Sequence, residues 1–429
     1  MVTKSSKTKD ARKDASLVEV DVLVSGGGLA GGTLSLALAQ NGFRVATVDR
    51  ENPADWVERG FDGRASAIAL SSQRVLDSVG IWDVIAREAA PIKDIRVADG
   101  HSPLFLHYDH EELATQGESA EPFGYMVENR SIRKALNVLV PQCENLTYYA
   151  PNEMTELERT PEGARATLND GTRIKAALVA VCEGRNSPTR DHAGIKITKW
   201  DYKQAGIVCT VEHERPHDFC AQEHFLPSGP FAILPLAGTK EKPGRRSSIV
   251  WTERADLWPI MMELDDEAFL EELELRFGDF LGKIEVVGPR FAYPLSLQYA
   301  ERYTDPRLVL VGDSAHGMHP IAGQGLNMGL RDVAALAEVL VDARRAGQDI
   351  GSLVALEHYE RWRRFDNALM LAVTDVLVRL FSNGIEPIQL ARDFGLAAVT
   401  EMPDLKRFYM RHAMGTVGEL PKLMRGAAL

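Results

Sequence analysis

The sequence predicts an α/β fold in which a discontinuous Rossmann-like domain carries an inserted β-rich domain and a helical C-terminus. Three observations predict it. A β-branched apolar run near residue 22 leads into a glycine-rich turn and an apolar helix, a similar run lies near residue 310, and strand-like alternation fills much of the chain between them. The expected division is a flexible leader at 1–16, the Rossmann-like domain at 17–195 and 296–345, the β-rich domain at 196–295, and the helical region at 346–429.

Length and composition are those of a globular protein. The chain has 429 residues, of which 45% are hydrophobic and 26% charged, enough for two or three domains. Asp and Glu outnumber Lys and Arg by 61 to 49, which argues against a free-standing nucleic-acid binder because such proteins need an excess of positive charge. The four cysteines form no CxxC pair, so we expect reduced cytosolic thiols and no metal site. No apolar stretch approaches the ~18 residues of a membrane-spanning helix.

Residues 20–49 predict a βαβ unit. Val20–Val24 is a short apolar run typical of a buried strand, and the turn Ser25–Gly32 follows it at once. Apolar residues over Leu34–Ala39 indicate a buried helix that ends at Asn41-Gly42, and Arg44–Asp49 indicates the second strand. A strand, a glycine turn, a helix and a strand within about 30 residues are typical of a right-handed crossover unit.

The rest of the chain predicts antiparallel strands, then an inserted domain, and then a further parallel strand with a helical region after it. The Asn169–Gly171 turn between two alternating runs predicts an antiparallel hairpin. From Lys196 to about Pro294 strand-like runs recur around one charged helix at 265–277, which suggests the inserted domain. Residues 308–311 again resemble a buried parallel strand, and the chain after Gly325 is expected to be helical.

The first glycine turn fits the motif G-x-G-x-x-G in the context that this motif requires, between a strand and a helix. Gly26 permits the tight turn, Gly28 lets the backbone approach a pyrophosphate, and Gly31 allows close packing of helix on strand. Asp49 ends the second strand about 20 residues further on, where a carboxylate accepts hydrogen bonds from ribose hydroxyls. The motif therefore favours FAD or NAD over NADP, and a structural turn without a ligand is the alternative.

A second glycine-rich turn distinguishes the two dinucleotides. Asp313 follows the strand at 308–311, and the segment His319–Asn327 supplies backbone amides at the start of a helix near Gly325. An NAD site has no use for a second helix N-terminus so far along the chain. A reduced flavin ring does, because it carries negative charge at its pyrimidine end. The pair of turns therefore predicts FAD, with Asp313 on a ribityl hydroxyl.

Both turns, together with Cys182–Arg190, resemble the three fingerprints of class A flavoprotein monooxygenases, whose FAD-binding domain is of the GR2, para-hydroxybenzoate hydroxylase-like type. Asp62–Ala69 and His319–Asp332 are similar to signatures of the ubiquinone-biosynthesis hydroxylases, and the likeness spans roughly residues 20–423. The resemblance implies an FAD-dependent monooxygenase that hydroxylates the aromatic ring of a polyprenylated phenol or quinol intermediate of ubiquinone biosynthesis. It implies molecular oxygen as co-substrate, a flavin C4a-hydroperoxide as the oxygen donor, and NAD(P)H or an external electron donor as reductant.

The resemblance also implies which residues contact the cofactor. Arg64 and Arg130 would contact the flavin or its phosphates, and Glu183 replaces the Asp that is usual in the middle fingerprint, which changes the reach of the carboxylate. The expected cofactor-binding residues are Gly26, Gly28, Leu29, Ala30, Gly31, Asp49, Arg50, Arg64, Arg130, Glu183, Asp313, Gly323, Gly325, Leu326 and Asn327. No catalytic side chain is assigned because the flavin carries the chemistry. His319 and Pro320 are candidates by position, and a structural role is the alternative for both, as it is for His316.

Two further features bear on the substrate and the partners. An apolar ring pocket, with plain core packing as the alternative, is expected to be lined by Phe225, Phe231, Leu234, Pro235 and Tyr293. The helix at 369–381, preceded by the basic run at 361–365, either packs on the same chain or attaches to a membrane surface or a partner. Because the implied substrate is a lipid, we expect a cytoplasmic protein peripheral to the inner membrane. A ubiquinone-biosynthesis complex and a homo-oligomer are its candidate assemblies.

Two other functions stay open at this point. A soluble small-phenol hydroxylase would carry the same flavin motifs, and a non-catalytic flavin-binding subunit of a biosynthetic complex would tolerate the exchange at Glu183. A flavin halogenase is disfavoured because its W-x-W-x-I-P pattern is missing.

Overall fold

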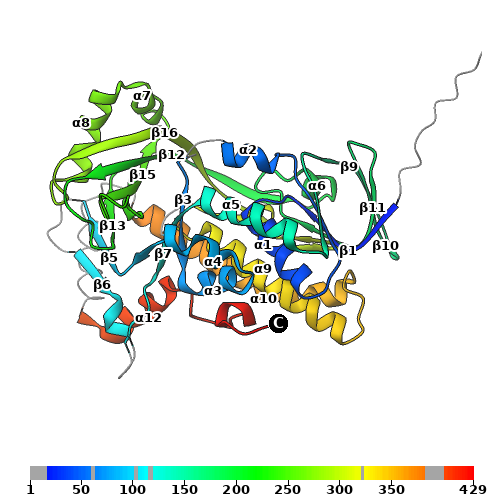
Figure 1. Ribbon diagram of the computed structural model, residues 1–429. Helices are drawn as coiled ribbons and strands as arrows, with labels where there is room; N and C mark the ends of the chain where they lie inside the picture. The colour runs from blue at the N-terminus through cyan, green and yellow to red at the C-terminus, as the bar shows by residue number, and fades with distance from the viewer. Residues whose placement is uncertain (1–16, 59–62, 101–104, 115–118, 320–322, 382–400) are drawn as a thin grey trace, which may run out of the picture.

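The computed structural model describes residues 17–58, 63–100, 105–114, 119–319, 323–381 and 401–429 (Figure 1). Within them the chain forms two large sheets side by side and one small sheet, with long helices packed along the first large sheet. The expected leader at 1–16 and the candidate Pro320 lie outside the described residues.

The first sheet is the predicted Rossmann-like sheet, and its order is β17-β18-β11-β1-β2-β8. These strands are β17 (Thr304–Asp305), β18 (Leu308–Leu310), β11 (Arg173–Val181), β1 (Leu17–Ser25), β2 (Val45–Val48) and β8 (Leu146–Tyr149), with β10 (Gly163–Leu168) and β9 (Met154–Thr160) added antiparallel beside the start of β11. The central strands are parallel and almost fully buried, as apolar runs of this kind require. The βαβ unit and the hairpin at 169–171 are therefore confirmed.

Register in this sheet aligns the ends of three strands. Ser25 of β1 lies opposite Val181 of β11, and Val181 lies opposite Leu310 of β18. The segments that follow these residues therefore start at one edge of the sheet, which is the edge where open parallel sheets bind ligands.

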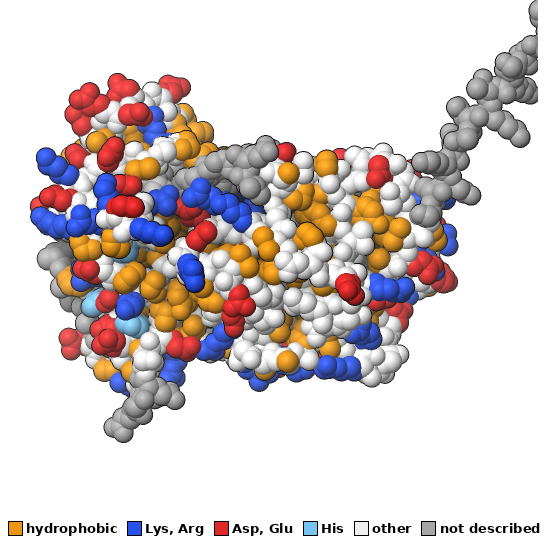
Figure 2. Space-filling model, in the orientation of Figure 1, with side chains coloured by type: hydrophobic (Ala, Val, Ile, Leu, Met, Phe, Trp, Pro, Cys, Tyr) orange, Lys and Arg blue, Asp and Glu red, His pale blue; other side chains and the backbone are white. Residues whose placement is uncertain are grey.

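The second sheet runs in the order β19-β16-β12-β15-β14-β13-β5-β6. Its strands are β19 (His316–Gly317), β16 (Ile284–Ala300), β12 (Ile197–His213), β15 (Arg246–Arg254), β14 (Gly229–Pro235), β13 (Cys220–Leu226), β5 (Asp94–Asp99) and β6 (Phe105–Asp109). Helices α7 (Trp258–Glu263) and α8 (Asp266–Phe277) cover one face through a core that contains Trp251, Phe269 and Phe277. The outer side of α8 is acidic, as Figure 2 shows at the upper left.

One strand pair in this sheet was not predicted. β5 and β6 come from the range 17–195 assigned to the Rossmann-like domain, yet β5 pairs in parallel with β13 and extends the second sheet. The pairing gives the main-chain groups along β13 partners on both sides, as at an edge strand that must be covered.

The small sheet lies between the two large ones. It consists of β3 (Ala65–Ala69), β7 (Gly124–Glu128) and β4 (Ala90–Ile92), all antiparallel. The helices around the sheets are α1 (Leu29–Gln40), α2 (Pro53–Glu58), α3 (Leu70–Ser78), α4 (Ile81–Ile85), α5 (Asn129–Leu139) and α6 (Pro188–His192).

The C-terminal part is helical, as predicted. Helix α9 (Gly325–Arg345) packs on α1 and is buried along most of its length, which suits its apolar composition. Helix α10 (Leu353–Phe381) and helix α12 (Pro403–Ala413) follow it. Among the described residues, no helix combines the length and the hydropathy needed to cross a bilayer.

Candidate functional site

Three segments far apart in the sequence meet at the carboxyl edge of the first sheet. The turn after β1, the loop after β11 and the loop after β18 start from neighbouring strands. Gly184 N donates to Ser314 Oγ at 3.1 Å, and Arg185 Nε lies 3.3 Å from Asp313 Oδ2. The three predicted fingerprints therefore form one continuous surface.

The glycines of the first turn have the geometry that a pyrophosphate site needs. Gly26 has φ +96°, and a Cβ there would lie 2.5 Å from the carbonyl oxygen of Cys182. A Cβ on Gly31 would lie 1.9 Å from the Gly26 carbonyl oxygen, so a larger residue would push helix α1 away from the turn. A Cβ on Gly28 would meet no described atom within 4 Å. The backbone is therefore open to a ligand where α1 begins.

Helix α1 begins without a side chain that caps its free amides. Gly28 is its N-cap residue, and no acidic residue lies in its first turn, where Leu29 and Ala30 stand. The amide groups and dipole of such a terminus attract an anion. The site fits the diphosphate of FAD.

Asp49 lies beside this turn, as expected. Its Oδ2 accepts a hydrogen bond from Gly27 N at 2.6 Å, and its Oδ1 accepts one from Glu51 N at 2.8 Å. Burial raises the pKa of Asp49, although the two backbone hydrogen bonds oppose that shift. The carboxylate is fixed next to the glycine turn, with Arg50 exposed beside it.

Glu183 is held by the protein itself. Its Oε1 accepts hydrogen bonds from Ser25 Oγ and Thr189 Oγ1, both at 2.5 Å, and its Oε2 accepts from Ser187 Oγ at 2.6 Å and from Thr189 N at 3.1 Å. These contacts join the end of β1 to the start of α6. The longer side chain that replaces the usual Asp therefore works as a positioning residue for the middle fingerprint.

The second glycine turn approaches the small sheet. Gly323 has φ +63°, and a Cβ there would lie 3.0 Å from Ala67 Cβ. Asn327 Oδ1 accepts from Ala69 N at 2.9 Å, and its Nδ2 donates to Ala67 O at 2.8 Å. The side chain of Asn327 thus fixes the first turn of α9 to β3, so the contact with a flavin ring that the sequence predicts would fall to its backbone amide.

Helix α9 starts much as α1 does. A Cβ on Gly325 would meet no described atom within 4 Å, and the first turn, which includes Leu326, has no acidic residue. The two helix starts are close together. Cβ atoms built on Gly312 and on Gly329 would each lie 3.8 Å from Ala30 Cβ. The two predicted glycine sites therefore converge in space.

A buried ionic network supports the second loop. Asp332 is fully buried, with His316 Nε2 2.6 Å from its Oδ2 and Arg363 Nε 2.7 Å from its Oδ1. Gly312 N also donates to it, at 2.9 Å. His316 thus has a structural role, which was the stated alternative. Asp332 is the last residue of the quoted signature, but its role as the centre of this network was not predicted.

The sequence also predicts that His319, Arg64 and Arg130 lie near the flavin. His319 is buried edge-on against Tyr202, with ring centroids 5.2 Å apart. Burial, helped by Arg185, lowers the pKa of His319 to about 4, so it is neutral at physiological pH. Arg64 O accepts from Asn129 N at 2.9 Å, which brings Arg64 and Arg130 together at the ends of β3 and β7.

Arg185 was missed as an individual residue, although it lies inside the middle fingerprint. Its guanidinium donates to Ser296 O on β16 at 2.9 Å and to Met318 O at 2.8 Å, besides its contact with Asp313. It therefore links the loops that follow β11 and β18 to the second sheet. Only the fold brings these partners together, so the sequence carried no signal for this role.

The residues expected to line a ring pocket separate onto two faces of the second sheet. We call the face opposite α7 and α8 the cofactor-side face. There Arg64 lies 5.9 Å from the ring centroid of Tyr293, and Phe225 stacks on Phe381 of α10 with centroids 4.0 Å apart. Leu234 packs in an apolar cluster with Ala67 and belongs to the same face.

Phe231 contradicts the pocket prediction. It is fully buried in the core under α8, edge-on to Trp251, so it follows the core-packing alternative. Pro235 shares the face of Phe231 by strand alternation. The sequence could not decide this because the pattern of a strand buried on both faces does not show which face a helix covers.

Comparison with known proteins agrees with this geometry. The family model for an FAD binding domain matches residues 19–367. The ubiquinone hydroxylase UbiL of Rhodospirillum rubrum is 56% identical over 412 residues, covering 95% of this chain and 93% of that protein. The 3-demethoxyubiquinol 3-hydroxylase of Escherichia coli is 32% identical and covers 92% of this chain and 98% of that protein.

The fold also resembles solved structures. The p-nitrophenol 4-monooxygenase PnpA of Pseudomonas putida superposes with a TM-score of 0.75 at 20% identity, covering 94% of this chain and all of that one. At this identity the likeness bears on the fold alone, and it matches the predicted fold class.

Proposed function

The chain belongs to the FAD-binding-domain family of class A flavoprotein monooxygenases that includes the ubiquinone hydroxylases, and from this premise we propose that it hydroxylates the aromatic ring of a polyprenylated phenol or quinol intermediate of ubiquinone biosynthesis. The relatives' names support the substrate class. The single structural observation that supports the site is the closeness of the two open helix starts, where Cβ atoms built on Gly312 and Gly329 would each lie 3.8 Å from Ala30 Cβ.

FAD, when bound and reduced, supplies the activated oxygen. We assign the remaining tasks to this chain's residues. The start of α1 would hold the diphosphate, Asp49 the ribose, Asp313 the ribityl chain, and the start of α9 the pyrimidine edge of the ring. The cofactor-side face of the second sheet would hold the substrate ring and keep water away from it.

A hydroxylation assay tests the proposal. The FAD-loaded protein is given NADPH or a chemical electron donor, a short-chain prenylated phenol and isotope-labelled oxygen. The expected result is a product that carries one labelled oxygen atom on the ring. Absence of labelled product with every donor, from protein that has retained FAD, would contradict it, and turnover restricted to water-soluble phenols would favour the small-phenol alternative.

We also propose that helix α10 places the protein on the membrane from which such a substrate is drawn. Exposed apolar side chains recur on one side of α10 at helical spacing: Phe365, Leu369, Val373, Val376 and Leu380. Phe365 is 75% exposed and Val376 60%, whereas Leu371 and Val378 on the other side are buried. A helix with one buried and one exposed apolar side suits the membrane interface.

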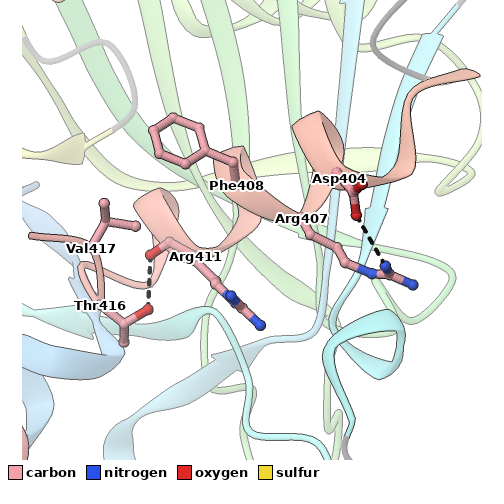
Figure 3. A pocket seen from close by; sticks show the side chains of 6 residues that line it. All are labelled: Asp404, Arg407, Phe408, Arg411, Thr416 and Val417. Carbon is pink, nitrogen blue, oxygen red and sulfur yellow. Dashed lines mark hydrogen bonds and ion pairs between the residues drawn. The ribbon is translucent and has the colours of Figure 1, made fainter.

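Helix α12 carries two exposed arginines. Arg407 and Arg411 extend from the same side of α12 around a shallow hollow of about 530 Å³ (Figure 3). Arg407 pairs with Asp404 at 3.5 Å, and no ion pair joins Arg411 to any residue that the structure describes. Exposed arginines beside apolar side chains favour an anionic membrane surface.

Co-sedimentation with phosphatidylcholine vesicles, with and without phosphatidylglycerol, tests the membrane contact. Replacing Leu369 and Val376 by Ser removes two half-exposed apolar side chains worth about 1 kcal/mol each, so binding should weaken roughly 30-fold. Leu275→Ser on α8 is the control, because Leu275 is even more exposed, at 79%, but lies on another element. If the double variant dissociates an oligomer or a complex and leaves vesicle binding unchanged, a protein covers this surface instead.

A further inference from the structure

One carboxylate lies on the cofactor-side face of the second sheet in a row that is otherwise apolar. Strand register joins the members of this row pairwise across β13, β14, β15, β12 and β16: Glu223, Ala232, Val250, Val208 and Phe291. Directly opposed residues of neighbouring strands point to the same face. Glu223 therefore points to the side on which Phe291 lies.

The small sheet connects this row to the loop that carries the second glycine turn. A Cβ on Gly63 would lie 2.1 Å from the Phe291 ring, which puts the residues before β3 directly against β16. At the other end, Ala221, two residues before Glu223, packs in one cluster with Ala67 of β3. Ala67 O in turn accepts a hydrogen bond from Asn327 Nδ2 at 2.8 Å, and a Cβ built on Gly323 would lie 3.0 Å from Ala67 Cβ. The small sheet thus links both ends of the row to the start of α9.

The row lies outside the apolar clusters of the described residues. On the opposite face of the same strands, Ile207, Ile249 and Ile233 belong to the core under α8. Val208, Val250 and Ala232 join none of the apolar clusters formed by residues 17–381 and 401–429 that the structure describes. Val208 and Ala232 are buried all the same, and apolar side chains outside a core beside a single polar group are typical of a binding pocket.

Glu223 is the one polar residue of this row. No hydrogen bond or ion pair joins it to any residue in the described part of the chain, and burial alone raises its pKa to about 7. A sheltered carboxylate without a partner is costly to the folded protein, and such groups are normally satisfied by a donor. Phe225, two residues further along β13 and on the same face, stacks on Phe381 of α10. A ligand that lies on this row can supply a donor to the half-buried side chain.

We propose that Glu223 is the specificity-determining residue of the ring pocket and that it accepts a hydrogen bond from a ring hydroxyl of the substrate. The inference rests on the proposed function and deepens it, because it identifies the feature of the phenol or quinol that this chain selects. A ring hydroxyl is a donor that matches the carboxylate, whereas a methyl ether at the same position offers no donor and leaves Glu223 unsatisfied.

A selectivity cycle tests this role. The FAD-loaded protein is titrated with 2-prenylphenol and with its methyl ether, and binding is followed by the perturbation of the flavin absorption spectrum. The wild type should prefer the phenol by roughly 10- to 100-fold, which is the worth of a hydrogen bond to a charged group. Glu223→Leu should abolish the preference, and Glu223→Gln should retain part of it because the amide oxygen still accepts. Glu285→Gln, at an exposed position of β16, is the matched control and should behave as wild type.

A second measurement, of protein stability, needs no ligand. Removing a sheltered, unpaired carboxylate should stabilise the free protein, so Glu223→Gln should unfold at a higher urea concentration than wild type at pH 8. An unchanged preference for the phenol in both Glu223 variants would overturn the role of Glu223. Failure of the wild type to bind either compound would instead contradict the proposed function.

Discussion

Replacing Asp332 by Asn should destabilise the protein strongly, although the two side chains have nearly the same shape. Asp332 is fully buried, and its two oxygens face Gly312 N, His316, Arg363 and Asn367. An amide can accept on one side only, and its NH2 group would face donors on the other. Arg363, at 1% exposure of its side chain, would lose its fully buried charge partner and, among the described residues, keep Asp366 and Asn367.

The size of the effect follows from this burial. Breaking a buried ion pair by removing one charge typically costs about 3–5 kcal/mol, because the other charge stays buried. Urea unfolding followed by circular dichroism gives the free energy of unfolding, and absorbance at the flavin band gives retained FAD. Retention should fall as well, because Gly312 and His316 flank Asp313 in the loop that Asp332 supports.

The control is on the same helix. Asp342 also forms ion pairs, but its side chain is 55% exposed, so Asp342→Asn should cost less than about 1 kcal/mol. If Asp332→Asn costs no more than Asp342→Asn, the network does not stabilise the second loop, and the reasoning fails.

Three further predictions concern the same edge of the sheet. Gly31→Ala should lower FAD retention, because the new Cβ would lie 1.9 Å from the Gly26 carbonyl oxygen and would push α1 away from the turn. This displacement should cost about 1–3 kcal/mol of folding free energy. A flavin absorbance per protein equal to that of wild type would contradict the prediction. Glu183→Gln should lose about 1–3 kcal/mol in urea unfolding, because an NH2 group would replace an acceptor of Ser and Thr hydroxyls, and a variant as stable as wild type would show that these hydrogen bonds are dispensable. Burial alone would raise the pKa of Asp332, but His316 and Arg363 outweigh it and hold that pKa well below its usual range. Its contribution to stability should therefore be complete above about pH 4 and be lost at lower pH, so the stability gap between wild type and Asp332→Asn should narrow on acidification, and a gap that stays constant would refute this assignment.

Local patterns were enough to predict the elements that carry the cofactor site. The strand–turn–helix–strand unit at 20–49 and the helix that begins at Gly325 depend on short-range periodicity and glycine placement, both visible in the sequence. The convergence of the two turns could be inferred because one extended cofactor explains both of them.

Features that depend on long-range pairing could not be read in the same way. The parallel pairing of β5 with β13 joins residues more than 100 positions apart, and no local pattern specifies it. The face of Phe231 was set by the position of α8, which the strand pattern does not contain. Glu223 did leave a signal, a carboxylate within the apolar alternation of 220–226, but that signal has meaning only when the face is known.

Helix α10 connects the two halves of the molecule in a way that constrains how a long substrate can enter. Near its middle, Arg363 is bonded to Asp332 beneath the flavin loop, and at its end Phe381 stacks on Phe225 of the second sheet, about 27 Å further along the axis. A continuous helix held at both points opposes a hinge motion that would open the two large sheets relative to each other. A polyprenylated substrate would therefore have to reach the second sheet without such a motion.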